Sequence, residues 1–340
     1  MIHRSKAPLR IGLAGGGTDV SPYCDEFGGA ILNATISLNA NATIEQTNDG
    51  KITLEAMDRS EAETHDWSES LPLNNHLDLL KGVYNRIQQD YPFKNEGFKL
   101  TTYVDAPAGS GLGTSSTLVV AIVGAFVEML QLPLGEYDIA HYAYGIERSD
   151  LLLAGGRQDQ YAATFGGVNY MEFYANDKVI VNPLRIRQRY IDELENNLLL
   201  YYTSTSRESA KIIVEQSKNV TEKKSQSIEA MHQLKQQALF MKEALLKGQL
   251  DEIGRILDIG FEQKRRMASG INNELIDAIY DTAKRNGASG GKISGAGGGG
   301  FMIFYCPGTT KYKVRESLEQ FGGAHRNYQF VKHGLKTWSV

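Results

Sequence analysis

Glycine and hydroxyl residues are concentrated in one segment of the sequence, PAGSGLGTSST at 107–117. The β-branched and aromatic stretch FKLTTYV (98–104) precedes it, and the apolar run LVVAIVGAFVEML (118–130) follows it. This order predicts a strand, a glycine loop and the N-terminus of a helix. Glycine lets a backbone approach a ligand closely, and the unpaired N–H groups that begin a helix favour an anion. The segment favours a phosphate-binding loop; a flexible turn that caps the helix is the alternative.

Four charged residues beside glycine-rich segments suit the transfer of a phosphoryl group. Such a transfer needs magnesium ligands, a group that orients or deprotonates the acceptor hydroxyl, and positive charge near the transferred group. Glu147, at the end of a predicted helix, is a candidate magnesium ligand together with the hydroxyls of 114–117. Asp159 is a candidate base and Arg10 a candidate cation. Asp19, which follows three glycines, can accept hydrogen bonds from sugar hydroxyls.

Each of these charged residues also has an ordinary structural interpretation. Glu147 could end a surface helix, Asp159 could cap a short helix, Arg10 could be a cation at a strand edge, and Asp19 could cap a turn. Each structural interpretation is the stronger one when its residue is taken alone. Together with the loop they form five features, each tied to a glycine-rich segment, and this combination favours the chemical interpretation.

Other chemistries fit the sequence poorly. Gly295, Gly297 and Gly300 match G-x-G-x-x-G, but a dinucleotide fold needs a strand before this pattern, and here the apolar strand follows it. The seven histidines form no H-E-x-x-H or Cys/His pattern, so we do not expect a zinc enzyme.

The composition predicts a globular enzyme that binds neither nucleic acid nor a membrane. The chain has 340 residues and a formal net charge of −4, and no apolar run reaches the length of a membrane span. The basic run at 264–266 is expected to be a solvated helix face. Two distant cysteines, Cys24 and Cys306, indicate no disulfide framework and favour a cytoplasmic location. The start of the sequence lacks the apolar core of a signal peptide. The sequence leaves a homodimer open.

The pattern of elements changes along the chain. After a segment rich in expected strands, helical patterns dominate at 207–217, 225–246, 250–267 and 273–286. Residues 58–75 are expected to form an irregular surface loop, in which Trp67 either faces a bound adenine or is simply exposed.

Three motifs carry a resemblance to a known family. APLRIGLAGGGTD (7–19) is similar to an amino-terminal A-P-G-[RK] strand and turn, and PAGSGLGTSST (107–117) to a P-x-G-x-G-L-[GS]-S-S nucleotide loop. KISGAGGGGF (292–301) is similar to a carboxy-terminal K-x-[ST]-G-A-G-x-G-G loop. In this order the motifs resemble those of the galactose, homoserine, mevalonate and phosphomevalonate kinases, the GHMP kinases, over essentially the whole chain.

This resemblance implies an α+β fold of two domains with the active site between them. The amino-terminal ATP-binding domain would cover 1–195 and contain a left-handed βαβ crossover, and a ferredoxin-like carboxy-terminal domain would cover 196–340. ATP and Mg²⁺ would be the cofactors.

The resemblance also assigns roles to individual residues. The ATP phosphates would be wrapped by Pro107, Gly109, Ser110, Gly111, Leu112, Gly113, Thr114, Ser115 and Ser116. The sugar would be held by Gly16, Gly17, Thr18, Asp19, Gly297 and Gly298. We add Arg157 to these substrate-binding residues, although it has no counterpart in the family pattern. Ser115 and Glu147 match the magnesium ligands, with Thr114 or Ser116 as the alternative hydroxyl. Asp159 matches the catalytic aspartate, and Arg10 would polarise the reacting oxygens.

Further segments resemble the members of this family that phosphorylate a sugar at its anomeric hydroxyl: 15–36, 155–167 and 181–186. A heptose 7-phosphate is the implied acceptor, and its 1,7-bisphosphate would serve nucleotide-activated heptose and surface polysaccharide. A kinase of fucose or of an unphosphorylated heptose is the first alternative. A non-catalytic sensor of sugar and ATP is the second, although a sensor has no need of a base.

The sequence departs from the family pattern in two places. Glycines at 15–17 replace the family's G-E-H, and the segment that leads to Asp159 is about one residue longer and carries Arg157. We therefore expect Arg157 near the reacting phosphate. A phosphate already on the sugar would need a distal cation, for which Arg4, Lys6 and Arg207 are the candidates.

Overall fold

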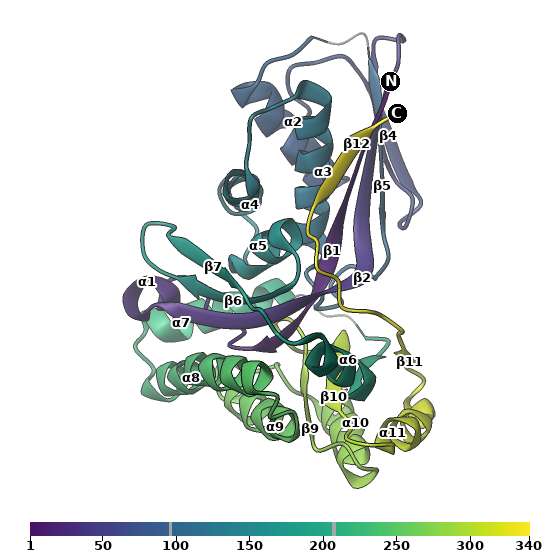
Figure 1. Ribbon diagram of the computed structural model, residues 1–340. Helices are drawn as coiled ribbons and strands as arrows, with labels where there is room; N and C mark the ends of the chain where they lie inside the picture. Colours follow the sequence, from purple (N-terminus) through teal and green to yellow (C-terminus); the bar gives the residue numbers. More distant parts are fainter. Residues whose placement is uncertain (95–96, 206–208) are drawn as a thin grey trace.

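Two β-sheets and the helices packed on them make up the computed structural model, which describes residues 1–94, 97–205 and 209–340 (Figure 1). The first sheet has eight strands: β1 (Ile2–Ala14), β2 (Gly29–Gln46), β3 (Lys51–Ala56), β4 (Glu61–Asp66), β5 (Phe98–Val104), β6 (Val168–Phe173), β7 (Val179–Pro183) and β12 (Lys336–Ser339). Their order is β12-β1-β2-β5-β3-β4, and β6 pairs with both β2 and β7. All of these pairs are antiparallel except β3 with β5.

The second sheet is antiparallel and has four strands in the order β11-β8-β10-β9. Its strands are β8 (Leu198–Tyr202), β9 (Gly290–Ile293), β10 (Phe301–Tyr305) and β11 (Ala324–His325). All five residues of β10 are buried, because β8 and β9 flank it and helices pack around it.

Helices connect the strands and cover the sheets. Those before β8 are α1 (Tyr23–Phe27), α2 (Asp78–Asp90), α3 (Thr114–Leu130), α4 (Glu136–Gly145), the π-helical turn η1 (Ile146–Asp150), α5 (Gln158–Phe165) and α6 (Gln188–Asn197). Those after it are α7 (Ser209–Thr221), α8 (Ser225–Lys247), α9 (Asp251–Arg265), α10 (Glu274–Arg285), α11 (Thr310–Leu318) and the 3₁₀ turn η2 (Glu319–Phe321). None of the helices in the described ranges combines the length and apolar character that crossing a bilayer requires.

Helix α3 is the central helix of the first half. Residues 119–126 are all buried, because the helix packs on β1 and β2 and is covered by α2, α4 and α5. A helix that is apolar on nearly every side must be surrounded in this way. Its fixed position determines where its first turn, which carries the hydroxyls of 114–117, meets the glycine loop.

The carboxy-terminal end of the chain returns to the first sheet. Strand β12 pairs with β1, so the two ends of the chain lie next to each other (Figure 1). Before the chain reaches the sheet, the Gln329 carbonyl accepts the Ser37 N–H of β2, and the Gln329 N–H donates to the Ser37 hydroxyl. Phe330 forms a β-bridge with Ile36. This crossing segment ties the two halves together. The division into domains 1–195 and 196–340 stays a prediction.

The two-domain α+β fold is confirmed, and so are the long helices of the second half. The expected irregular loop at 58–75 is wrong, since β4 pairs there with β3. Trp67 packs against Tyr84, Phe93 and Phe98, so its ring belongs to an aromatic cluster. Cys24 and Cys306 are buried free thiols and form no disulfide with each other, as expected.

Candidate functional site

A cleft of about 270 Å³ lies where the first turn of α3 meets residues from both halves of the chain. Its lining includes Gly109, Gly111, Gly113 and 114–116 from the glycine loop. The loop after η1, helix α7, and the segment between β9 and β10 complete the wall. Residues that are far apart in the sequence therefore converge on one opening.

Two glycine-rich segments are packed directly on each other at this cleft. Gly111 has a φ of +83°, and a Cβ on it would lie 2.6 Å from the Ser294 carbonyl oxygen, so no larger residue fits here. The Ser294 hydroxyl donates to the Gly111 carbonyl at 2.8 Å, and the Phe301 N–H donates to the Ser110 carbonyl at 2.8 Å. The segment 294–301 therefore holds the loop 107–113 in its shape.

The N-terminus of α3 points into the cleft. Gly113 is its N-cap residue and has no side chain with which to cap the first turn. The N–H groups of that turn therefore remain for a ligand, and the helix dipole favours an anion at this end. Three of the predicted nucleotide-loop residues do not line the cleft: Pro107, Ser110 and Leu112. Leu112 is buried, and its carbonyl accepts the Arg10 N–H at 3.1 Å.

Arg10 and Asp159 form an ion pair in the wall of the cleft. Nε of Arg10 lies 2.6 Å from Oδ1 of Asp159, and Nη1 of Arg10 donates to the Gly111 carbonyl at 2.5 Å. The Arg10 side chain is 4% exposed and that of Asp159 is 23% exposed. Asp159 also lies beside the α3 N-cap, since a Cβ on Gly113 would be 3.1 Å from its Cγ. The carboxylate is thus fixed and open to the cleft.

Glu147 is a buried carboxylate that reaches the cleft from the π-helical turn η1. The Ser116 hydroxyl donates to its Oε1 at 3.0 Å, and the Gln160 amide donates to its Oε2 at 2.5 Å. Burial is the main cause that raises the pKa of Glu147. Gln160 also donates to the Ser116 hydroxyl at 3.2 Å, which closes a ring of three side chains.

These oxygen atoms fit a magnesium ion. Mg²⁺ prefers oxygen ligands and is usually held by one or two carboxylates with substrate phosphates and water. Glu147 offers such a carboxylate, and Ser115 is exposed in the cleft wall, whereas the hydroxyl of Ser116 is engaged by Glu147. Within the described residues, no cluster of three or more His, Cys, Asp or Glu side chains could bind a metal on its own. The donor set therefore suits an ion that arrives with phosphate.

Asp19 lies against the N-terminus of α5. Its Oδ2 accepts the N–H groups of Arg157 at 2.9 Å and Gln158 at 3.1 Å, and the side chain lines the cleft. Burial is the main cause that raises its pKa. A Cβ on Gly156 would overlap this carboxylate, so the close approach requires glycine. The hydroxyl of Thr18 donates instead to backbone carbonyls and is fully buried.

The Arg157 guanidinium points away from the residues that line the cleft. It donates to the Tyr174 carbonyl at 2.8 Å and pairs with Asp25 at 3.2 Å and Asp177 at 2.9 Å. It also lies over the Tyr144 ring, 5.5 Å from the centroid. These contacts favour a structural role for the side chain; a position near the reacting phosphate stays a prediction.

Lys264 is a functional candidate that the sequence reasoning missed. The expectation of a solvated face at 264–266 is wrong for this residue, which is 3% exposed and lines the cleft. Its ammonium donates to the Gly295 carbonyl. Burial and then the neighbouring Arg10 lower the pKa of Lys264 to about 8, while Asp19 opposes the shift. The helical spacing of Lys264 with Ile253, Ile256, Leu257 and Phe261, all buried on α9, was the available signal.

The remaining predicted residues lie at different distances from the cleft. Gly17 lines it, whereas Gly16 lines a small adjoining cavity with Lys264 and Lys292. Gly297 packs on Ile271, and Gly298 lines a separate shallow hollow with Thr205 and Asn273.

Two of the three candidates for a distal phosphate site, Arg4 and Lys6, do not line the cleft. Both lie on β1, where it pairs with β2 on one side and β12 on the other. Arg4 precedes Arg10 by six residues on this strand, which corresponds to a distance of about 20 Å. Arg207 lies outside the described residues.

Two family models match this chain. The model of the GHMP kinases N terminal domain matches residues 78–167, and the model of the GHMP kinases C terminal matches residues 241–324. The first range contains the glycine loop, Glu147 and Asp159, and the second contains Lys264 and the segment 294–301.

Similar proteins are known over the full length. D-glycero-alpha-D-manno-heptose 7-phosphate kinase of Campylobacter jejuni is 47% identical over 337 residues, which is 99% of each chain. A crystal structure described as a D-glycero-D-manno-heptose 1-phosphate kinase of Bacteroides thetaiotaomicron is 47% identical, covers 99% of each chain and has a TM-score of 0.85. Galactokinase of Lactococcus lactis has a TM-score of 0.80 at 16% identity, with coverage of 98% and 95%, and shares the fold.

Proposed function

The chain belongs to the GHMP kinases, and from this premise we propose that it phosphorylates the anomeric O1 hydroxyl of D-glycero-D-manno-heptose 7-phosphate with ATP. It is a phosphotransferase that acts on a sugar hydroxyl. The proposed acceptor rests on the 47% identity, over nearly the whole of both chains, with the heptose 7-phosphate kinase.

One observation carries the proposed chemistry. The Arg10–Asp159 pair lies beside the N-terminus of α3 and opens into the same cleft as Glu147. A phosphoryl transfer needs an anion cradle, a base or orienting group, and compensating positive charge. All three are within one cavity, and each side chain is fixed by hydrogen bonds.

The glycine loop and the first turn of α3 would bind the ATP phosphates. Gly109, Gly111 and Gly113 line the cleft and leave the backbone open to the phosphate oxygens. Pro107, Ser110 and Leu112 would support the loop from behind, in line with their positions outside the lining. Mg²⁺ would be held by Glu147 and the Ser115 hydroxyl, and it would neutralise charge on the phosphates.

Asp159 would orient the sugar O1 hydroxyl and accept its proton. O1 then forms a bond to the γ-phosphorus, the bond from that phosphorus to the β–γ bridging oxygen breaks, and ADP leaves with the electron pair. Arg10 would keep Asp159 in position and place positive charge beside the reacting oxygens. Because a loose transition state needs little early deprotonation, orientation is as much the task of Asp159 as proton transfer.

The sugar would lie against Asp19 and Lys264. Asp19 can accept hydrogen bonds from sugar hydroxyls while it stays anchored to the N–H groups of α5. Lys264 is a buried cation in the cleft, which suits an acceptor that already carries a phosphate. Gly17 borders the same space; direct sugar contacts by Gly16, Thr18, Arg157, Gly297 and Gly298 remain predictions.

The alternatives have weaker support. The L-fucokinase/L-fucose-1-P guanylyltransferase of Bacteroides fragilis is 29% identical, over 87% of this chain and 34% of its own length. The sensor has weaker support, since the similar proteins are kinases and Glu147, Asp159 and Arg10 all line the cleft. A cytoplasmic location and a homodimer stay predictions, and the first agrees with two unpaired cysteines.

Phosphorus NMR of the product tests the proposal. With MgATP and D-glycero-D-manno-heptose 7-phosphate, we expect ADP and one new phosphomonoester whose phosphorus couples to the anomeric proton. A new phosphate on another oxygen would contradict O1 as the acceptor. Consumption of ATP without a new sugar phosphate would contradict the kinase assignment to this sugar.

A further inference from the structure

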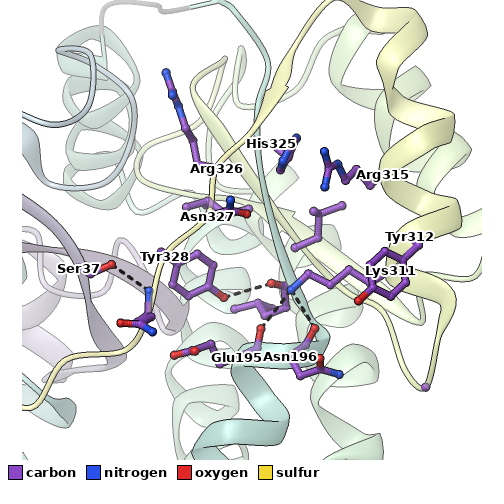
Figure 2. A pocket seen from close by; sticks show the side chains of 15 residues that line it. Ser37, Glu195, Asn196, Lys311, Tyr312, Arg315, His325, Arg326, Asn327 and Tyr328 are labelled. Carbon is purple, nitrogen blue, oxygen red and sulfur yellow. Dashed lines mark hydrogen bonds between the residues drawn. The ribbon is translucent and has the colours of Figure 1, made fainter.

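A second cavity, of about 550 Å³, lies in the carboxy-terminal half and shares no lining residue with the cleft. It is enclosed by the end of α6, strand β8, the start of α11 and the segment 325–329, and Ser37 of β2 closes one side (Figure 2). Its volume is in the range of roughly 300–1,000 Å³ that small-molecule sites occupy. The reaction proposed above uses none of its lining residues.

The charged side chains that line this cavity are mostly positive. The lining contains three basic side chains, Lys311, Arg315 and Arg326, and one carboxylate, Glu195. The Glu195 carboxylate is already engaged, because it accepts the Phe330 N–H at 2.6 Å. Within the described residues, no carboxylate lies within 4.0 Å of the Arg315 or Arg326 guanidinium. Glu195 acts on Lys311 from within the lining, and the cavity as a whole keeps an excess of positive charge.

Lys311 is held in a defined position. Its ammonium donates to the backbone carbonyls of Glu195 at 3.2 Å and Asn196 at 2.8 Å, where α6 ends (Figure 2). An ammonium has three protons to donate, so one direction remains for a ligand. A cation fixed before binding loses less conformational freedom when an anion arrives.

Arg315 and His325 lie side by side on another wall of the cavity (Figure 2). Burial and then Arg315 lower the pKa of His325, with smaller contributions from Arg326 and Lys311, while Glu319 opposes the shift. The histidine is therefore in a positive field and, when neutral, can offer one N–H donor.

Apolar and aromatic surface completes the cavity. The buried leucines of β8 form part of the lining, and the ring of Tyr328 forms a wall while its hydroxyl donates to the Leu198 carbonyl at 3.2 Å. Polar groups make up the larger part of this lining, which suits an anionic ligand with a small apolar part. Guanidinium groups suit phosphate in particular, because their N–H groups match pairs of phosphate oxygens.

We propose that this cavity binds a small phosphorylated molecule, with its phosphate between Arg315 and Lys311 and with Arg326 at the opening. The site is separate from the cleft and joins the two halves of the chain. Strand β8 lines the cavity and continues to Thr203 and Thr205, which bond to Gly300 at 2.9 Å and 2.6 Å. Gln329, on the opposite side, bonds to Ser37 of the first sheet.

Calorimetric titration with pyrophosphate tests the proposal on the full-length protein without nucleotide, so that no other phosphate competes for the second cavity. We compare the wild type with Arg315→Ala/Arg326→Ala, and with a control of equal charge change, Lys313→Ala/Lys247→Ala. The control lysines are on the same helix α11 and on α8, and neither lines a cavity described above.

We expect the wild type to bind pyrophosphate in this cavity in addition to the cleft, and we expect the Arg315/Arg326 variant to bind it in this cavity at least about 10-fold more weakly, the loss typical of a charge-assisted contact. The control should bind like the wild type. All four substituted side chains are exposed, and the ion pair of Lys247 with Glu243 lies on the surface, so the variants should fold. Absence of wild-type binding, or equal binding by both double variants, would overturn the proposal.

Discussion

Arg10 and Asp159 are separated by 149 positions in the sequence and joined by a 2.6 Å hydrogen bond in the wall of the cleft. The same guanidinium also donates to the Gly111 carbonyl, so it connects the acidic group to the glycine loop. A side chain that makes both contacts needs two N–H groups in a fixed plane. Arginine offers this arrangement and lysine does not.

Substitutions of Arg10 should therefore separate charge from geometry. Arg10→Ala should lower kcat on the order of 10²–10³-fold, the cost typical of removing one preorganised donor. Arg10→Lys should fall between this variant and the wild type, because it keeps the charge and loses one of the two contacts. Steady-state kinetics with the sugar phosphate measures both, and Arg4→Ala on the same strand is the control. Full kcat in Arg10→Ala would refute the role.

Asp159→Asn removes the charge and keeps the shape. If Asp159 accepts the O1 proton, kcat should fall on the order of 10²–10⁴-fold. Nucleotide affinity should change little, because the α3 N-terminus and the loop are untouched. We would measure kcat and ADP affinity for Asp159→Asn and for the control Asp58→Asn, which changes an exposed acid. Near-normal turnover would mean that Asp159 is neither base nor orienting group.

Gln160 should act on the metal through Glu147. It holds the Glu147 carboxylate at 2.5 Å and is fully buried, yet the sequence reasoning gave it no role. Gln160→Leu should weaken divalent-cation binding by about 10–100-fold, the effect typical of losing a group that orients a metal ligand.

Electron paramagnetic resonance of Mn²⁺ bound with a non-hydrolysable ATP analogue measures the affinity without turnover. The exposed Gln233→Leu is the control for Gln160→Leu. Mn²⁺ affinity equal to that of the wild type would show that Glu147 does not need Gln160.

Lys264 should give the reaction a pH dependence. With a pKa lowered to about 8, its ammonium is charged at pH 7 and loses its proton as the pH rises through about 8. Attraction of an anionic sugar phosphate should weaken in the same range, so kcat/KM, which reports the free enzyme, should fall above pH 8.

Two variants identify the group behind this fall. Lys264→Arg keeps its charge at every pH used, so its kcat/KM should no longer fall near pH 8. The exposed neighbour Arg266→Met should retain the wild-type profile. An unchanged profile in Lys264→Arg would assign the titration to another group.

Arg157→Ala should act mainly on stability. The change leaves Asp25 and Asp177 without their cation and empties a buried site, so we expect a loss of about 1.5–3 kcal/mol in the free energy of unfolding. Urea unfolding monitored by circular dichroism measures this. Unchanged kcat and Michaelis constants would exclude a position for Arg157 at the reacting phosphate, and unchanged stability would contradict the structural role.

Local features of the site could be predicted from sequence, because each depends on a short pattern. The glycines and hydroxyls before an apolar helix identified the loop at 107–117, and acids beside glycine segments identified Glu147 and Asp159. The structure brings these residues into one cleft. Their individual roles rest on resemblance and await the variants above.

Other features depend on contacts between distant segments, and a short sequence pattern does not determine them. A strand at 61–66 in a polar sequence exists because β3 pairs with it at the sheet edge. Lys264 is a basic residue like its exposed neighbour Arg266. It is buried because α9 packs against the segment near Gly295. The return of β12 to the first sheet likewise follows from tertiary structure.

The most direct measurement is ADP release with MgATP for a panel of acceptors: heptose 7-phosphate, free heptose, mannose, fucose and galactose. We predict that kcat/KM is highest for heptose 7-phosphate and much lower for each free sugar, because Lys264 places a buried cation in the cleft. Turnover that is equal or greater with a free sugar would contradict the proposed acceptor and leave the kinase chemistry in place.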